Sequence, residues 1–254
     1  QYNNRDNFNE RSLILKRILV IIPTYNEADN ILKIIPLILE NSDAENEYNI
    51  LVVDDNSPDG TAKLVEDYNN PRVNILKREK KSGLGTAYVA GFKYAIKENY
   101  DCVFEMDADF SHDPKYLKEF IKKIDEGYDL VIGSRYIDGI SVLNWPLRRL
   151  ILSYLASVYT RTVTGLKVMD TTAGFMCYKV NSLKQINLDE VRSNGYSFQI
   201  EMKFKMYKKG FKIVEVPILF IDRREGESKM SRKVVYEAYF MVWKLKFKSI
   251  FGKL

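Results

Sequence analysis

VFEMDADFSHDP, residues 103–114, joins a short apolar run to two closely spaced carboxylates, Asp107 and Asp109. The apolar run predicts a buried strand, and open α/β sheets bind their ligands at the carboxyl ends of such strands. Carboxylates suit Mg²⁺ or Mn²⁺, which proteins usually hold through one or two carboxylates together with the substrate's phosphates. The same residues also fit a polar strand-to-helix turn, with Asp113 capping a helix that opens at Pro114. On this segment alone both interpretations stay open.

Segments on both sides of this stretch alternate between strand and helix patterns. Short continuous apolar runs predict buried strands, and apolar residues at helical spacing predict helices. The predicted strands are residues 17–23, 49–55, 73–76, 101–109 and 128–135, and the predicted helices are residues 27–41, 59–69, 85–99 and 115–126. This alternation implies right-handed crossovers and a mostly parallel sheet, so the predicted fold class is α/β.

The pattern changes in the second half of the chain. Residues 145–164 predict an amphipathic helix whose apolar side carries Leu147, Leu150, Ile151, Leu155 and Val158. The remaining predicted elements are strands at 168–178 and 211–221, a helix at 198–209 and a tail helix at 233–251. No repeat and no Pro/Gly/Ser-rich linker divides the chain. We therefore expect a polar N-terminal arm at 1–16, one domain at 17–230 and a C-terminal helical segment at 231–254.

The predicted tail helix mixes aromatic and basic side chains. The aromatic residues are Tyr239, Phe240, Trp243, Phe247 and Phe251, and the basic residues among them are Lys244, Lys246 and Lys248. This mixture suits a membrane interface, and it also suits a helix that packs on the domain with a solvated face. No stretch of the chain reaches the roughly 18 uninterrupted apolar residues that a membrane-spanning helix needs.

Composition narrows the chemistry. The 254 residues are 46% apolar, and 39 basic against 34 acidic side chains give a net charge of only +5, too balanced to indicate nucleic-acid binding. The only histidine is His112, which removes most Ser-His, Cys-His and multi-histidine metal chemistries. Catalysis would therefore rest on carboxylates, Arg, Lys, Tyr, backbone groups or a metal. Cys102 and Cys177 lie in apolar runs and are expected to be core thiols of a reduced compartment.

Three further motifs carry groups that can bind a ligand. In PTYNE (23–27), Tyr25 can stack on a flat ring and Glu27 can accept hydrogen bonds, although a simple strand end followed by a helix cap explains the motif as well. In DDNSPDGT (54–61), Asp55 can accept from the N–H edge of a nucleobase, or the motif is an Asx-turn. In KKSGLGTAYVAG (80–91), the glycines at 83 and 85 either let a ligand approach the backbone or make a tight turn into a helix.

Seven motifs follow one another in a fixed order: PTYNE, DDNSPDGT, GLGTAY, MDADFSH, GSRY, GYSFQIEM and DRREGESKM. Together they resemble the GT-A-fold glycosyltransferases of family 2, and within these the dolichol-phosphate (polyprenol-phosphate) mannose synthases. The resemblance runs from about residue 17 to residue 230. It implies a mostly parallel central sheet flanked by helices with C-terminal amphipathic surface helices. It also implies GDP-mannose as donor, a divalent metal, and inversion at the anomeric carbon.

Carried over by position, the resemblance also implies site residues. Those that bind the donor are Pro23, Tyr25, Glu27, Val53, Asp55, Asp107, Ala108, Asp109, Arg135, Arg223 and Lys229. Of these, Asp107 and Asp109 would hold Mg²⁺ or Mn²⁺ and would act in catalysis together with Arg135, Arg223 and Lys229. Arg149 and Ser153, which are i and i+4 on one helix, would grip the phosphate of the lipid acceptor, or Arg149 is an ordinary surface residue.

Two positions depart from the pattern of the resembling family. Arg224 stands where an uncharged residue is more usual, so either arginine of the pair 223–224 can close over phosphates. Ser111 stands where some relatives have Gln near the metal, which leaves a third metal contact open.

The sequence thus predicts an enzyme that moves mannose from GDP-mannose to a polyprenyl phosphate. We expect it to work as a peripheral protein on the cytoplasmic face of a membrane, and a membrane partner subunit stays open. One alternative is the same acceptor with a UDP-sugar donor of the glucose or GlcNAc type. Another is a nucleotide-sugar-binding scaffold without catalysis, against which the intact Asp107/Asp109 pair and Arg223/Lys229 argue.

Overall fold

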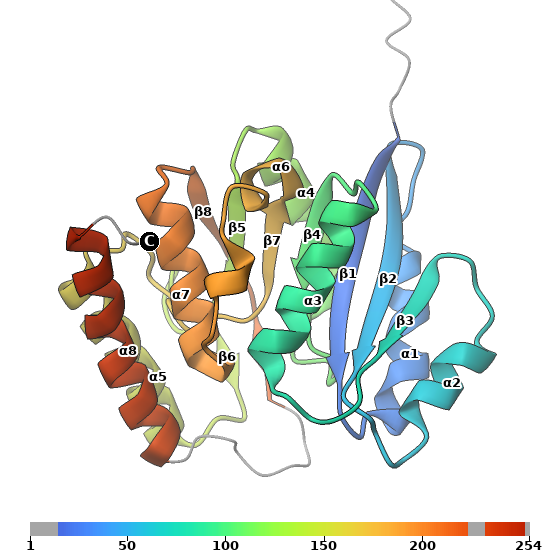
Figure 1. The fold of residues 1–254 in the computed structure, drawn as a ribbon, viewed down its shortest axis with the longest axis horizontal. Coiled ribbons are helices and arrows are strands. Elements are labelled where there is room, and N and C mark those ends of the chain that lie inside the picture. The colour runs from blue at the N-terminus through green and yellow to red at the C-terminus, as the bar shows by residue number, and fades with distance from the viewer. Residues whose placement is uncertain (1–14, 223–231, 252–254) are drawn as a thin grey trace, which may run out of the picture.

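A seven-stranded sheet forms the centre of the protein, in the order β3-β2-β1-β4-β7-β5-β8 (Figure 1). The computed structural model describes residues 15–222 and 232–251, with side chains given from residue 239 onward in the second range. The strands of this sheet are β1 (Lys16–Thr24), β2 (Asn46–Asp54), β3 (Val73–Lys77), β4 (Cys102–Glu105), β5 (Leu130–Ser134), β7 (Met176–Lys179) and β8 (Ile213–Pro217). Only β7 runs antiparallel to its neighbours within this sheet, so the predicted α/β fold with a mostly parallel sheet is confirmed.

Helices cover both faces of the sheet (Figure 1). Side chains of β1 alternate between the two faces: Ile18 and Val20 pack with α1, α2 and α4, whereas Leu19 and Ile21 pack with α3, α6 and α7. This burial on both faces explains the continuous apolar run of β1. The helices are α1 (Ala28–Leu39), α2 (Thr61–Asp67), α3 (Leu84–Lys97), α4 (Leu117–Asp125), α5 (Leu147–Thr164), α6 (Val180–Leu183), α7 (Gly195–Lys208) and α8 (Arg232–Ile250). Two short strands, β6 (Val142–Leu143) and β9 (Phe220–Ile221), pair separately.

One edge of the sheet collects the loops that carry the candidate site residues. Strands β1, β2, β4, β5 and β8 share one direction, so their carboxyl ends meet at this edge. The antiparallel strand β7 begins there, which places the loop before it next to the loop after β5. Ligands of open α/β sheets bind at such an edge.

Two predicted strands are shorter in the structure. β4 ends at Glu105, so Asp107 and Asp109 lie in the loop after the strand and not within it. The prediction of a strand over 168–178 is wrong for its first part, because only Met176–Lys179 forms β7. In the preceding segment Asp170 and Thr171 bind side chains of other elements, and these bonds hold the segment as a loop.

Helix α5 packs its serine and threonine side against the domain. The side chains buried against the domain are Ser153, Ser157, Thr160 and Thr164. Ser157 meets the loop before β7, where the N–H and the hydroxyl of Thr171 lie 3.3 Å from its oxygen. The leucine side stays open, with Leu147 68% exposed, Ile151 49% and Leu155 54%.

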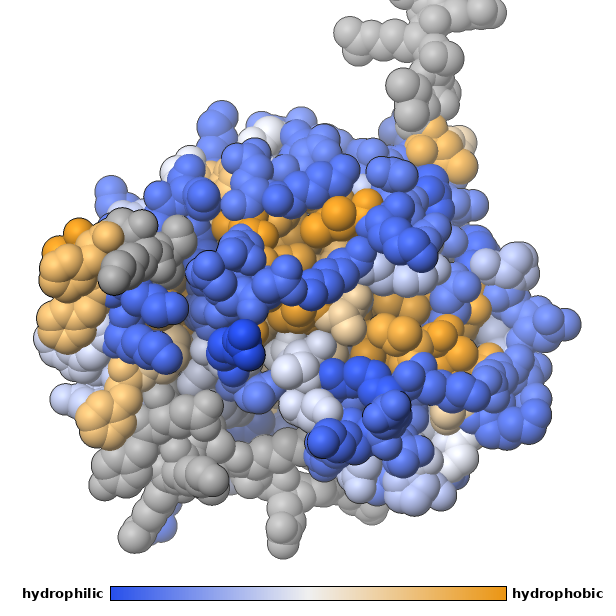
Figure 2. Space-filling view, in the orientation of Figure 1, coloured by the Kyte–Doolittle hydropathy of each residue, from blue (hydrophilic) through white to orange (hydrophobic). Residues whose placement is uncertain are grey.

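The C-terminal helix α8 lies outside α7 and beside α5 (Figure 1). It contacts Ile200 and Phe204 of α7 through Val242 and Leu245, and Tyr159 of α5 stacks on Tyr239 with 5.1 Å between ring centroids. Its other side exposes Phe240, Trp243 and Phe247, and Figure 2 shows apolar surface gathered over this helix. Within the described ranges, no helix has the length and hydropathy needed to cross a bilayer. Cys102 and Cys177 are buried thiols, as expected.

Candidate active site

The loops after β1 and β2 are joined by hydrogen bonds into one platform. The backbone N–H of Asn26 donates to Ser57 Oγ over 3.1 Å, and that of Glu27 donates to Thr61 Oγ1 over 3.0 Å. Asp59 accepts from the N–H of Thr61, the first residue of α2, over 3.0 Å. The predicted donor-binding motifs PTYNE and DDNSPDGT therefore hold each other in place.

Asp55 lies on this platform, buried, with a partner that the sequence analysis missed. Its carboxylate forms an ion pair with Arg78 and accepts the N–H of Ser82 over 3.2 Å. Arg78 also donates to Thr86 Oγ1 over 2.7 Å and to the carbonyl of Gly83 over 3.2 Å. Asp55 therefore anchors the loop before α3 as well, and a ligand can use only the acceptor positions that Arg78 and Ser82 leave.

The other predicted donor residues near β1 and β2 differ in what they can offer. Tyr25 is 38% exposed, and Lys81 Nζ lies 3.7 Å from its ring centroid, so one face of the ring is covered by a cation. The side chain of Glu27 accepts from Asn30 Nδ2 over 2.9 Å. The side chain of Val53 is fully buried in the core.

The two glycines at the start of α3 allow close packing. A Cβ on Gly85 would lie 2.2 Å from the carbonyl oxygen of Ser193, and one on Gly83 would lie 2.6 Å from the side chain of Asn194. Real Cβ atoms do not approach backbone oxygens this closely. The positive φ of 97° at Gly83 agrees with a tight turn into the helix, and the structure adds a reason that was not predicted: close contact between the start of α3 and the segment before α7.

Asp107 and Asp109 follow β4 in a loop that turns sharply. Phe110 after them has a φ of 63°, and Asp109 Oδ1 accepts from both the N–H and the hydroxyl of Ser111, over 3.1 and 2.6 Å. Tyr88 of α3 donates its hydroxyl to Asp107 Oδ1 over 3.3 Å. Both carboxylates are only half-buried, so they stay accessible to a ligand while their neighbours orient them.

His112 supports this loop from inside the core. Its Nδ1 accepts the backbone N–H of Asp107 over 3.0 Å, and its ring stacks on Phe175 with 5.0 Å between centroids. Burial lowers the pKa of His112, which favours the neutral ring. A neutral, buried imidazole whose Nδ1 is already occupied is a positioning group and not a catalytic base.

Below the loop lies a buried polar cluster that the sequence analysis did not predict. Glu105, the last residue of β4, accepts from Tyr178 over 2.8 Å and from Gln199 of α7 over 2.9 Å. Burial raises the pKa of Glu105 to about 8. Burial also lowers the pKa of Lys203 to about 8, and this ammonium donates to the carbonyl of Ala173 over 2.6 Å. The GYSFQIEM motif thus anchors α7 beneath Asp107.

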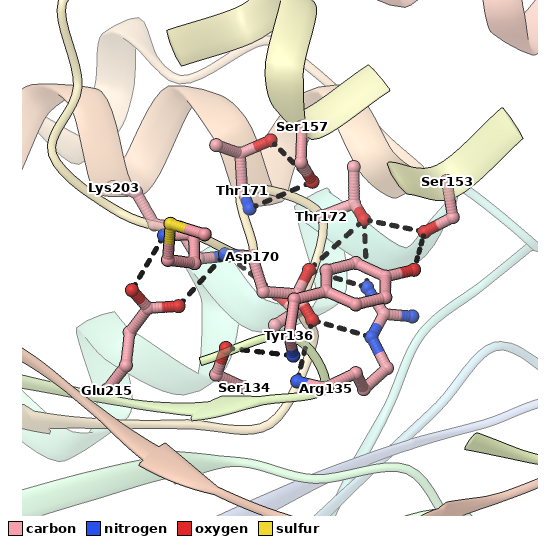
Figure 3. Close-up of polar contacts among 12 residues, drawn as sticks. Ser134, Arg135, Tyr136, Ser153, Ser157, Asp170, Thr171, Thr172, Lys203 and Glu215 are labelled. Atoms are coloured by element: carbon pink, nitrogen blue, oxygen red, sulfur yellow. Dashed lines mark hydrogen bonds and ion pairs between the residues drawn. The ribbon is translucent and has the colours of Figure 1, made fainter. Parts of the chain in front are cut away.

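Arg135, after β5, is almost completely buried in a hydrogen-bonded network (Figure 3). Its guanidinium binds both carboxylate oxygens of Asp170 over 2.6 and 2.7 Å and donates to Thr172 Oγ1 over 2.8 Å. Burial opposes the charge on Asp170, yet Arg135 outweighs it and keeps the pKa of Asp170 below its ordinary value. The backbone N–H of Asp170 donates in turn to Glu215 over 2.9 Å. Local sequence patterns give no signal for such a pair, because its members lie 35 residues apart.

The predicted acceptor residues lie beside this network, in different surroundings. The hydroxyl of Ser153 is buried, accepts from Tyr136 over 2.8 Å and lies 3.3 Å from Thr172 Oγ1 (Figure 3). Arg149 is partly exposed, pairs with Asp222 and lies with its Cζ 4.2 Å from the centroid of the Trp145 ring. Ser153 thus supports the residues that hold Arg135, and Arg149 is the group of the two that a ligand can reach.

The family follows from the chain's similarity to known proteins. Residues 19–186 match the model of the family described as "Glycosyl transferase family 2". The chain belongs to this family. It is 46% identical over 231 residues to the polyprenol monophosphomannose synthase of Mycolicibacterium smegmatis, covering 89% of this chain and 86% of the relative. It is 45% identical over 225 residues to the undecaprenyl-phosphate mannosyltransferase of Micrococcus luteus, covering 87% and 90%. The resemblance drawn from the seven motifs is thus confirmed.

Among solved structures, this glycosyltransferase is similar to the mannosyl-3-phosphoglycerate synthase of Rubrobacter xylanophilus. The TM-score is 0.66, the sequence identity is 20%, and the match covers 96% of this chain and 77% of that one. At this identity the likeness concerns the fold. It agrees with the GT-A architecture expected from the motifs.

The carboxylates of this glycosyltransferase fit a divalent metal whose remaining ligands come from the substrate. Within residues 15–222 and 232–251, no group of three or more His, Cys, Asp or Glu side chains could hold a metal. Asp107 and Asp109 supply two carboxylates, and His112 points into the core. Mg²⁺ and Mn²⁺ are commonly held by so few carboxylates when a diphosphate provides the remaining oxygens. Arg223 and Lys229, predicted to bind the donor, and the neighbouring Arg224 lie outside the described residues.

Proposed function

We propose that this glycosyltransferase moves mannose from GDP-mannose to a polyprenyl phosphate with inversion, giving polyprenyl-phosphate mannose and GDP. The observation that carries the proposal is the identity of 45–46%, over nearly nine tenths of this chain, to two enzymes named for mannose and a polyprenyl phosphate. The arrangement of the candidate site supports it. A carboxylate pair follows β4, and a cluster of arginines lies on the other side of β7, after β5 and at the start of α5.

On the donor side, the proposal gives the nucleoside to the platform after β1 and β2. Tyr25 would stack on the base, Asp55 would accept from its N–H edge, and Asp107 and Asp109 would hold Mg²⁺ or Mn²⁺ against the diphosphate. The metal would neutralise the negative charge that develops on the departing GDP. Ala108, buried between the two carboxylates in the sequence, would contribute backbone groups to the same region.

On the acceptor side, an oxygen of the lipid phosphate attacks the anomeric carbon of mannose. The new carbon–oxygen bond forms as the bond to the β-phosphate of GDP breaks, and GDP leaves with that electron pair. A phosphate monoester is already an oxyanion near neutral pH, so no strong general base is needed. This chemistry suits a site whose only histidine is buried. Positive charge from Arg149, with Arg135 behind it, would hold the nucleophile in line.

We further propose that the exposed sides of α5 and α8 rest on the cytoplasmic face of a membrane, where the lipid acceptor lies. Leu147, Ile151 and Leu155 form one apolar stripe, and the exposed aromatic residues of α8 form another. Lys244, Lys246 and Lys248 lie among those aromatic residues, as expected of a helix at an anionic lipid surface. Of the two roles that the sequence left open for the tail helix, the structure supports both at once: one side packs on α7 and the other is open.

A paired substitution on α8 tests the membrane contact. Full burial of one large apolar side chain is worth roughly 1.5–3 kcal/mol. Losing the partial insertion of two, in Phe240→Ser with Phe247→Ser, should therefore weaken binding to phosphatidylcholine–phosphatidylglycerol vesicles about tenfold. Co-sedimentation measures the binding, and GDP affinity without vesicles should not change. The control is Leu32→Ser with Leu37→Ser, two exposed leucines of α1 on the opposite face of the sheet. Equal losses in both variants would contradict the proposed contact.

A donor panel tests the function itself. The protein is incubated with radiolabelled GDP-mannose, UDP-glucose or UDP-GlcNAc, Mn²⁺ and a short polyprenyl phosphate, and the lipid product is extracted. We expect label in the lipid with GDP-mannose. Transfer from a UDP-sugar alone would favour that alternative donor, and no transfer with any donor would favour the scaffold.

Asp55→Asn should weaken donor binding with little effect on the maximal rate. The amide keeps an acceptor for Arg78 and replaces the other carboxylate oxygen by a donor, which opposes both the N–H of Ser82 and the N–H edge of the base. A base contact is the same in the ground state and the transition state, so KM for GDP-mannose should rise about tenfold with kcat within about twofold. Glu79→Ala, an exposed neighbour of Arg78, is the control. Tighter binding of UDP than of GDP by the unchanged protein would contradict the role assigned to Asp55.

A further inference from the structure

Trp145, two residues before the start of α5, contacts both arginines of the acceptor side with its ring. The centroid of its ring is 5.1 Å from Cζ of Arg135 and 4.2 Å from Cζ of Arg149. The edge-to-face contact with Phe220, with 5.4 Å between centroids, fixes the ring from a further direction. Two guanidinium groups repel each other, and the negative ring face of an indole offsets that repulsion for both. The tryptophan ring thus stabilises both cations close to the start of α5.

Each of these three side chains keeps at least one N–H donor without an acceptor among the described residues. Nε1 of Trp145 and Nε of Arg149 are both buried and unpartnered there. Arg135 uses Nε and one terminal nitrogen on Asp170 and Thr172, and in Figure 3 its other terminal nitrogen makes no contact with the residues drawn. A buried indole N–H normally finds a partner, because leaving it unpaired costs stability. Donors on three side chains that meet at one aromatic ring, two of them charged, suit an anion with several oxygens.

The acidic groups that face the cluster leave these donors available. Asp170 binds the Nε edge of Arg135, and Asp222 binds Nη1 of Arg149. Each carboxylate fixes the plane of its arginine, and neither takes the donors described above. The site therefore holds its two cations in place before an anion arrives.

We propose that Trp145 is the residue that organises the phosphate subsite for the acceptor, and that its indole N–H donates to an oxygen of a phosphate monoester. This inference rests on the proposed function, and it adds a residue that recognises the phosphate of the acceptor. The ring contacts both guanidinium groups, so that Arg149 meets the phosphate with Arg135 behind it, and the neutral N–H contributes direction without further charge. A monoester dianion matches two cations and several donors, whereas the corresponding alcohol offers neither the charge nor the oxygens.

The two tryptophans of the chain allow a direct test without turnover. Trp243→Phe leaves Trp145 as the only tryptophan, so its fluorescence reports on the subsite alone. A polyprenyl monophosphate with three isoprene units, added without donor, should change this emission saturably, and the matching polyprenol should not. In kinetic assays of the full chain, Trp145→Phe keeps a ring and removes the N–H. It should raise KM for the lipid phosphate about fivefold, with GDP affinity and kcat within about twofold.

The outcomes separate this inference from the proposed function. No transfer to any polyprenyl phosphate by the unchanged protein would overturn the proposed function. Transfer by the unchanged protein, with KM for the lipid phosphate unaltered in Trp145→Phe, would overturn the role of Trp145 alone. An emission change that the alcohol reproduces would also overturn it, because the ring would then be sensing the isoprenoid chain. If Trp145→Phe does not fold, the fluorescence titration of Trp243→Phe still decides between these outcomes.

Discussion

Asp109→Asn should remove metal-dependent transfer and leave the fold intact. A metal at a developing anionic leaving group supplies several kcal/mol of stabilisation, and a loss of roughly 4 kcal/mol corresponds to about a 1000-fold lower rate. The amide oxygen can still accept from Ser111, and the half-buried side chain contributes little to packing, so stability should change little. Calorimetry with GDP and Mn²⁺ measures nucleotide affinity, transfer kinetics measure the rate, and thermal unfolding measures stability.

The matched control for this substitution is Asp113→Asn in the same loop. Asp113 accepts from the N–H of Lys115 over 3.0 Å and caps the short helical turn that begins at Pro114. It thus undergoes the same change of charge a few residues away, in a role that concerns only structure. GDP affinity in the presence of Mn²⁺ should survive Asp113→Asn and fall in Asp109→Asn. Metal-dependent affinity and turnover like those of the unchanged protein in Asp109→Asn would end the assignment of Asp109 as a ligand.

Much of the fold could be predicted because the central strands are buried on both faces. The apolar runs of β1 and β2 are continuous, so they are easily recognised as strands. Because the carboxyl ends of parallel strands meet at one edge of a sheet, PTYNE, Asp55 and Asp107 are then expected at that edge. The order of motifs supplied the family, which the similarity to known mannosyltransferases confirms. The individual roles of the site residues stay predictions that the substitutions described here can test.

Contacts between residues that lie far apart along the chain could not be predicted from the sequence. The segment before β7 looks like a strand, but Asp170 pairs with Arg135 and Thr171 meets Ser157, and these bonds keep it a loop. The same hydroxyl contacts explain why α5 buries its serines and threonines and exposes its leucines. Hydrophobic periodicity predicts that a helix has two sides, and tertiary contacts decide which side packs. The ion pair of Arg78 with Asp55 was not predicted for the same reason, because the two residues are 23 positions apart in the sequence.

Arg149→Ala should act on the lipid acceptor and not on the nucleotide. A lost charge-assisted contact to phosphate is worth roughly 1.5–3 kcal/mol, so KM for polyprenyl phosphate should rise about 10- to 150-fold. GDP-mannose affinity without lipid should stay within about twofold, because the nucleotide platform lies on the other side of the Asp107–Asp109 loop. Acceptor titration kinetics and donor binding, measured on the same protein, check both expectations.

The substitution also leaves Asp222 without its cation, so thermal unfolding has to accompany the kinetics. Arg148→Ala provides the control, because Arg148 is the exposed neighbour on the same turn of α5 and carries the same charge. If both variants raise the acceptor KM by the same factor, the assay is measuring general attraction between a basic helix and an anionic lipid. A collapse of donor affinity with unchanged acceptor KM in Arg149→Ala would instead move the start of α5 into the donor site. A selective rise in acceptor KM in Arg149→Ala, with normal stability, is the result expected if the arginine that stacks on Trp145 binds the nucleophile.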